Sequence, residues 1–573
     1  MGVPFEADIT NLLKEKKFEK VLELLKNPEN DNEVTNNVWN LVSNICSTLK
    51  TNGLVQEESD VILCKKLLLH LVDRGNPKEI IIALMEEADS FKDHSYFCLL
   101  LDPLQRVLKK VPGKRGKSLE WVLSTLNAHI QTLPLPEDLD LQGDEKLLLD
   151  ADSSVIDTNY VLENYYLFLE PFVDEVSHET LSKKEHYFID RVAHQQEILQ
   201  KHILKLFYHP FLFHDLYVES EFRPKSTIRI LCEKYVKCSL KITRNVIKLF
   251  SYDRISTKTH DSTQDEQDVD QIPKLAFANL AYLLFVENFA LDFQPFVYSH
   301  QYEFIKHMEY VIILLSRKEN LVLFKGLKLA QSFIDKLMEF ELSYDYTELE
   351  ISTRFPIALL NVAIYCQIET HRKTSVNLFL SYISKCDWKS RYHLIMQVIT
   401  TINHSGVQGL VINLCKNYVH ETLTGNVDGD YFVGRNLNLI MRNVFTLSNG
   451  VETDILENCD KIVTALNFLR YLLLKDQKNL CQTGVWDMID LIKENFIHPL
   501  GTGLDLSRAH YKQVAKDADE AKKQKSVNTT VSVNSEVLPN IPLNFQKEVF
   551  EKALVTFDMI ESILSRVKEL ISY

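Results

Sequence analysis

The sequence predicts an all-α fold, a HEAT/armadillo-like α-solenoid built from irregular helical pairs. The first observation is compositional: the 573 residues include only 16 glycines and 16 prolines, about half the usual combined share of roughly 12%. Sandwiches, barrels and propellers need these residues at their many turns, so an all-β fold is excluded. The second observation is that apolar residues recur with the helical period along nearly the whole chain, and no segment alternates as a strand would.

The helical pattern begins near the N-terminus. Over residues 8–25, apolar side chains form one stripe, and lysines and glutamates occupy the other face. At Asn76-Pro77, a capping residue is followed by proline in the first turn, which is typical of a helix start. Further helices of the first half are expected at 37–49, 60–72, 77–87, 160–176, 185–208, 227–249 and 273–288.

In the second half the predicted helices come as consecutive pairs. They are 303–316 with 320–340, 356–367 with 372–385, 390–403 with 407–421, and 435–447 with 458–475. Their spacing is irregular but centred near the roughly 40–47 residues of HEAT and armadillo repeats. Short connections make paired helices antiparallel neighbours, and one pair cannot bury its apolar face alone. A stack of pairs is therefore expected.

Polar segments divide the chain. An acidic loop is expected at 133–157, and a polar acidic loop or linker at 256–272. We therefore predict N-terminal HEAT-like repeats over 1–255 and C-terminal HEAT-like repeats over 273–573. A final apolar stripe, over 545–571, would cap the stack.

Charge and cysteine usage exclude several classes of protein. The net charge is −15 and no long basic stripe is present, so we expect no nucleic-acid binding. No apolar run approaches the ~18–20 residues of a membrane span, and no signal peptide is recognised. The ten scattered cysteines form no CxxC motif, which argues against a disulfide framework or a structural zinc site. We expect a cytoplasmic protein, with the nucleus as a further location.

No local motif indicates catalysis or a cofactor. Residues 113–118 end like a phosphate-binding loop, but Val111 replaces the required first glycine and the preceding residues 99–110 have a helical pattern. The GxSxG, papain-type and kinase-type signatures are absent, although a catalytic group assembled only in space would leave no such signature.

Four histidines cluster in the sequence, at His194, His202, His209 and His214. Their spacing does not match a metal-ligand pair on a helix, and no carboxylate completes a ligand pattern. Cys232 and Cys238 are interpreted as two thiols of one helix. We expect no enzyme activity, no metal, no cofactor and no small-molecule substrate.

Recognition through a surface remains, because solenoids present long curved faces. The core stripe of 458–475 is predicted to be Ile462, Leu466, Leu469 and Leu473. The opposite stripe is Asp460, Thr464, Asn467 and Tyr471, flanked by Arg470. Tyrosine and arginine are enriched at interfaces, whereas a plainly solvated helix face is the alternative interpretation.

Several segments of the C-terminal half resemble the glomulin family, helical-repeat inhibitors of cullin-RING ubiquitin ligases. The segments are Asn403-His404-Ser405-Gly406-Val407, Glu452 to Leu456, Leu466 to Leu472, Gln482 to Trp486, Ala509-His510-Tyr511 and Thr556 to Ser562. The first half matches more sparsely, and residues 184–271 depart most.

This resemblance implies a mechanism. In that family the C-terminal repeats bind the RING domain of the RING-box subunit, and through it a cullin, and cover the surface that recruits the ubiquitin-conjugating enzyme. The implied RING-binding residues here are Asp460, Thr464, Asn467, Arg470 and Tyr471, unless this block only packs the solenoid. The alternative function is a scaffold or adaptor for another partner, in a kinetochore, stress-response or signalling complex.

Overall fold

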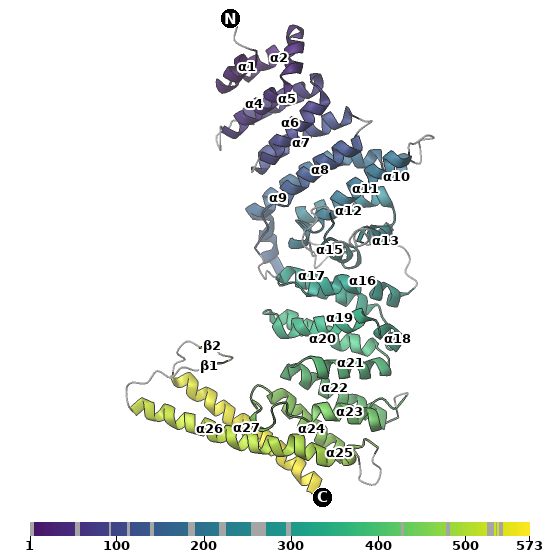
Figure 1. Ribbon diagram of the computed structural model, residues 1–573, viewed down its shortest axis with the longest axis vertical. Coiled ribbons are helices and arrows are strands. Elements are labelled where there is room, and N and C mark those ends of the chain that lie inside the picture. The colour runs from purple at the N-terminus through teal and green to yellow at the C-terminus, as the bar shows by residue number, and fades with distance from the viewer. Residues whose placement is uncertain are drawn as a thin grey trace, which may run out of the picture. The chain divides into compact units, whose positions relative to one another are not determined.

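The structure is a computed structural model, and it confirms an all-α helical-repeat solenoid (Figure 1). It describes residues 5–51, 58–90, 93–111, 115–137, 143–181, 189–216, 225–253, 271–293, 299–425, 429–476, 482–523, 532–533, 536–537 and 543–572. Contacts group the chain into two compact units, 1–333 and 334–573. Most of the predicted linker at 256–272 lies outside the described residues, so that boundary stays a prediction.

The first unit is a stack of helices that follow one another in chain order. Its α-helices are α1 (Phe5–Lys14), α2 (Phe18–Lys26), α3 (Asp31–Asn36), α4 (Val38–Thr51), α5 (Glu58–Arg74), α6 (Pro77–Ser90), α7 (His94–Lys109), α8 (Arg115–Ile130), α9 (Ser153–Glu175), α10 (His178–Leu181), α11 (Ile189–Leu206), α12 (Thr227–Thr243), α13 (Val246–Leu249), α15 (Lys274–Phe285), α16 (His300–Leu315) and α17 (Asn320–Asp335), which ends just beyond the unit. Short 3₁₀ turns are η1 (Pro28–Asn30), η2 (Gly143–Ala151), η3 (Phe211–Phe213) and η4 (Leu291–Phe293).

Helices of this unit pack on the helix two places further along the chain, or three where the short α10 intervenes, as well as on the next one. Helix α4 packs on α6, α5 on α7, α7 on α9, and α9 on α12. This pattern is typical of a two-layer repeat stack, in which successive helices alternate between the layers. Each helix thereby buries its apolar stripe against neighbours on both sides.

The second unit continues with the same kind of helices. They are α18 (Tyr344–Thr347), α19 (Glu350–Tyr365), α20 (Glu369–Lys385), α21 (Trp388–Thr401), α22 (Ser405–Leu423), α23 (Gly434–Val444), α24 (Cys459–Lys475), α25 (Val485–Ile492), α26 (His498–Lys523) and α27 (Leu543–Ser572). Between them lie the 3₁₀ turn η5 (Gly450–Glu452), the π-helical turn η6 (Lys493–Ile497) and a two-stranded ribbon of β1 (Ser532–Val533) and β2 (Glu536–Val537).

The predicted pairs of this unit are present as helices, but the packing of the last pair differs from the predicted pairing. Helix α19 packs on α20 and α21 on α22, as predicted, whereas α24 packs most extensively on α22, and α23 packs on α21. The last helix, α27, packs on α24 and α26 and caps the stack. Its buried stripe is Ala553, Phe557, Ile560, Leu564 and Val567. Val549 lies within the predicted stripe of 545–571 but is 54% exposed.

Several predicted element bounds were wrong. The predicted helix 227–249 is two helices, α12 and α13, with Arg244 at a left-handed φ of 52° between them. The single stripe over residues 8–25 is two helices, α1 and α2, because Lys16 adopts a left-handed φ of 56° between them. The acidic loop at 133–157 ends early, since Asp152 caps α9 by accepting a hydrogen bond from the Ser154 amide. Helix α19 begins well before Pro356 rather than at it.

Proline is tolerated inside α19 because a neighbouring helix replaces the missing hydrogen bond. Pro356 has no N–H to donate to the carbonyl of Ser352, four residues earlier. The hydroxyl of Tyr382, on α20, donates to that carbonyl at 3.4 Å. The pairing of α19 with α20 therefore stabilises a helix that proline would otherwise interrupt.

The core of the first unit contains a buried ammonium group. Lys325 on α17 is 0% exposed, and its Nζ donates to the carbonyls of Phe211 at 3.0 Å and Leu212 at 2.7 Å. The Nζ also lies 3.5 Å from Oδ1 of Asn279, whose amide donates to the Phe207 carbonyl. The lysine thus holds the segment containing η3 against α15 and α17.

Candidate partner-binding surface

Helix α24 carries the residues that the sequence singles out for recognition, and its apolar periodicity decides which face is buried. All four residues of the predicted core stripe are buried, together with three more apolar neighbours. The full buried set is Ile462, Ala465, Leu466, Phe468, Leu469, Leu472 and Leu473. These side chains pack against α22, α25 and α27. The predicted core of α24 is therefore confirmed.

The five predicted partner-binding residues share the remaining part of the helix. Asp460 and Asn467 are exposed, whereas Thr464, Arg470 and Tyr471 are half-buried. We name this set the α24 face. Three of its members contact groups within the chain, so part of the face serves the packing of α24 on α22.

The first half of the α24 face lies against a glycine of α22. A Cβ atom at Gly409 would come within 3.0 Å of the Thr464 hydroxyl and 3.2 Å of the Asp460 carbonyl. The Thr464 hydroxyl donates to that same carbonyl. Only a glycine lets the two helices approach this closely without displacement, which explains Gly409.

The second half of the α24 face is joined to α22 by a tyrosine and a histidine. The hydroxyl of Tyr471 lies 3.0 Å from Nδ1 of His420, and the two rings meet edge to face. Burial raises the pKa of Tyr471, so its hydroxyl remains protonated near neutral pH. Sequence analysis missed His420, because it lies 51 residues before Tyr471 and no local pattern marks it.

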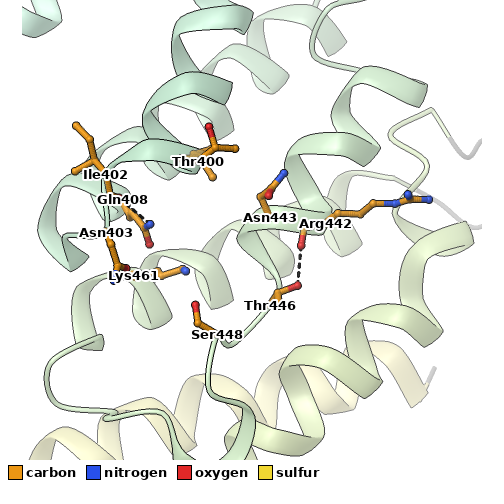
Figure 2. Close-up of a pocket in the computed structure, with 10 residues that line it drawn as sticks. Thr400, Ile402, Asn403, Gln408, Arg442, Asn443, Thr446, Ser448 and Lys461 are labelled. Atoms are coloured by element: carbon orange, nitrogen blue, oxygen red, sulfur yellow. Dashed lines mark hydrogen bonds between the residues drawn. The ribbon is translucent and has the colours of Figure 1, made fainter. Parts of the chain in front are cut away.

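A polar cleft of about 370 Å³ opens beside the start of α24 (Figure 2). Four consecutive segments contribute to it: the end of α21 with the turn that follows, the first turns of α22, the end of α23, and Lys461 on α24. Its lining residues are Ile399, Thr400, Ile402, Asn403, Gln408, Arg442, Asn443, Thr446, Ser448 and Lys461. We call it the Lys461 cleft. Sequence analysis missed it because the lining is assembled from separate segments.

The histidines that cluster in the sequence contact groups of the fold, in the part of the chain that the structure describes. His202 lies 2.5 Å from the amide of Asn127, and Nδ1 of His214 lies 2.9 Å from the Pro210 carbonyl. Burial lowers the pKa of His209 and of His214 to about 4, so both are neutral near pH 7. Within the described ranges, no three His, Cys, Asp or Glu side chains are grouped to hold a metal ion.

The phosphate-loop-like segment and the two cysteines of α12 also belong to the helical framework. Arg115, the first residue of α8, is buried and pairs with Glu175; residues 112–114 lie outside the described part. Cys232 and Cys238 are buried in α12, and burial raises the pKa of each thiol. In the part of the chain that is described, no helix has the length and hydropathy needed to span a bilayer.

Comparison with known proteins relates the whole chain to one family. A family model described as "Uncharacterised protein family, YAP/Alf4/glomulin" matches residues 6–553. Glomulin of Homo sapiens is 32% identical over 561 residues, which cover 96% of this chain and 90% of the human protein. Glomulin of Mus musculus is 31% identical over 559 residues, with the same coverage of each chain. The chain therefore belongs to the YAP/Alf4/glomulin family.

Proposed function

We propose that the chain is a non-catalytic regulator of SCF and other cullin-RING ubiquitin ligases, acting in the cytoplasm and nucleus. It binds the RING domain of the RING-box subunit, and through it a cullin, and blocks recruitment of the ubiquitin-conjugating enzyme. The observation that carries this proposal is the similarity to human glomulin across 96% of the chain, joined to the resemblance of its C-terminal segments to that family of inhibitors.

The mechanism requires a surface rather than a reactive group. A RING domain held on the repeats of the second unit would be covered where the conjugating enzyme docks, so inhibition would follow occupancy. The zinc ions of such a complex belong to the RING, and the chain supplies polar and aromatic contacts. Asn467, Arg470 and Tyr471 are the proposed centre of the α24 face, with Asp460 and Thr464 at its edge.

The residues of the α24 face differ in their contacts within the chain. Thr464 and Tyr471 also contact α22, so their replacement would disturb the packing of the two helices as well as the partner. Asn467 is exposed on the same helix and offers an amide that can both donate and accept. Arg470 offers a planar guanidinium, the group best suited to recognise carboxylates and carbonyls at an interface.

A reconstituted cullin-RING ubiquitylation reaction tests the function. Adding the full chain should suppress substrate ubiquitylation in proportion to the fraction of RING-box subunit that is bound. Binding without any suppression would contradict the occlusion mechanism, and absence of binding would contradict the proposed partner.

Substitutions on α24 test the residues separately from the function. Asn467→Ala and Arg470→Ala should each weaken RING binding, with a cost on the order of 2 kcal/mol if they are central anchors. Lys373→Ala provides the control, because Lys373 is exposed on α20 and pairs with Glu369 in the same helix. Unchanged affinity in both α24 variants would remove these residues from the site while leaving the function intact.

A scaffold or adaptor is the second candidate function, and the breadth of the family description favours keeping it. An adaptor would bind its partner without lowering ligase activity. The same ubiquitylation reaction separates the two, since suppression supports the inhibitor and unchanged chain formation at full occupancy supports the adaptor.

A further inference from the structure

The Lys461 cleft presents one positive charge without a negative charge beside it. Its lining contains two basic residues, three amides and three hydroxyls, and no aspartate or glutamate. This is notable in a chain with 79 acidic and 64 basic residues. Figure 2 shows Lys461 pointing into the cleft, whereas Arg442 extends away from it.

The backbone at Lys461 is held in place, but among the described residues its ammonium forms no ion pair. Its backbone amide donates to the Ser405 hydroxyl at 3.1 Å, which fixes the start of α24 against the start of α22. Burial lowers the pKa of Lys461, and no carboxylate acts against that shift. A half-buried cation without a counterion is stabilised by an anion that enters the cleft.

The walls of the cleft are held by hydrogen bonds inside the chain. The Gln408 amide donates to the Ile402 carbonyl at 3.0 Å, and the Thr446 hydroxyl donates to the Arg442 carbonyl at 2.7 Å. The Asn443 amide donates to its own helix as well. These hydrogen bonds use donor groups of the cleft wall. Lys461 is therefore the principal group that attracts an anion.

Ser448 and Asn403 add neutral donors beside the ammonium. The hydroxyl of Ser448 and the amide of Asn403 both line the cleft. A carboxylate has two oxygens that can accept from an ammonium and a hydroxyl together. The cleft volume is about 370 Å³, which is enough to admit an acidic side chain.

We propose that the Lys461 cleft binds one acidic side chain, aspartate or glutamate, of the protein that docks on the α24 face. The placement follows from α22, since Gln408 lines the cleft and the next residue, Gly409, lies against Asp460 and Thr464 of the α24 face. This inference rests on the proposed function, because the α24 face must hold a partner for its acidic side chain to reach the cleft. The partner is recognised there by charge, and the polar and aromatic contacts of the α24 face lie further along α24.

The test compares the affinity of full-length variants for the RING-box subunit at two salt concentrations. Lys461→Gln should weaken binding about tenfold or more, because the partner carboxylate would be left buried without its cation. It should also reduce the salt dependence of binding. Lys461→Arg keeps the charge and should stay near the wild-type affinity, while Lys461→Glu should bind more weakly than Lys461→Gln.

Lys373→Gln is the matched control, since it removes an exposed lysine of the same unit and should change affinity by less than about twofold. If wild-type chain binds and Lys461→Gln binds equally well, the cleft proposal is wrong while the proposed function stands. If wild-type chain does not bind the RING-box subunit, the proposed function fails and the cleft proposal fails with it. Circular dichroism of each variant confirms that affinity changes do not reflect unfolding.

Discussion

Each unit contains a lysine removed from water, and the two are treated in opposite ways. Lys325 in the first unit is fully buried, yet its ammonium donates to two backbone carbonyls and lies near the oxygen of Asn279. Lys461 in the second unit is only half-buried, and its side chain lines an open cleft that contains no acidic residue.

This difference indicates separate roles: Lys325 stabilises the fold, whereas Lys461 is proposed to bind a partner. Burial lowers the pKa of both lysines, to about 8 for Lys325, so each charge carries a desolvation cost. In the first unit the fold itself offsets that cost with hydrogen bonds. In the second unit, the desolvation cost of Lys461 would be offset by an anion from outside the chain. This is the property expected of a binding site.

The largest predicted effect on stability is at Lys325. Lys325→Met should lower the free energy of unfolding of the first unit by about 3 kcal/mol, because the carbonyls of Phe211 and Leu212 would stay buried without a donor. Urea denaturation measures the loss, and hydrogen exchange locates it in the first unit. Lys318→Met is the control, since Lys318 is exposed just before α17. Equal stability of the two variants would contradict the structural role of Lys325.

A second effect is the acid sensitivity of the first unit. The pKa values of His209 and His214 fall from 6.5 to about 4, so between these values the unfolded chain binds protons that the folded chain does not. Stability should therefore fall as pH is lowered from 6.5 toward 4, by roughly 1.4 kcal/mol per pH unit for each histidine. Urea denaturation at several pH values measures this slope.

The histidine variant His214→Gln provides the comparison for that slope. It should reduce the slope of unfolding free energy against pH by about the contribution of one histidine, whatever its effect on stability at pH 7. An unchanged slope would show that His214 is not held neutral in the folded chain. Hydrogen exchange should place the part of the loss that His214→Gln removes in the first unit.

The smallest predicted effect on stability is at Lys461. Lys461→Met removes a charge that is not paired with a carboxylate among the described residues, so the free energy of unfolding should change by no more than about 0.5 kcal/mol. Thermal or urea denaturation measures it beside Lys325→Met. A loss comparable to that of Lys325→Met would mean that Lys461 supports the fold, and would weaken the contrast between the two lysines.

The sequence predicted the helices of the second half well because periodic burial leaves a direct pattern. Ile462, Leu466, Leu469 and Leu473 were predicted to be buried, and they are. Bounds were wrong where a local backbone turn or cap intervened, as at Lys16 and Asp152, and in one case where a distant group did. The start of α19 could not be inferred from Pro356, because the compensating Tyr382 hydroxyl belongs to the next helix.

The candidate site was predictable only in part. The polar residues of α24 are visible as a stripe opposite the core, and the resemblance to the glomulin family directs attention to them. Neither feature indicates that Gly409 lies against Thr464, or that Tyr471 contacts His420. Such contacts join helices far apart in the chain, and a single-helix pattern contains no record of them.

The sequence by itself therefore determined the fold class, the core face of α24 and the family, because apolar period and extended similarity are properties of the chain alone. The tertiary structure decided which polar and charged groups have partners within the chain. Lys325 lies within an apolar helical run and Lys461 follows the polar start of α24, but neither local sequence indicates which groups its ammonium meets. Their difference arises because Lys325 meets carbonyls from a remote segment, whereas Lys461 meets a cleft between successive repeats.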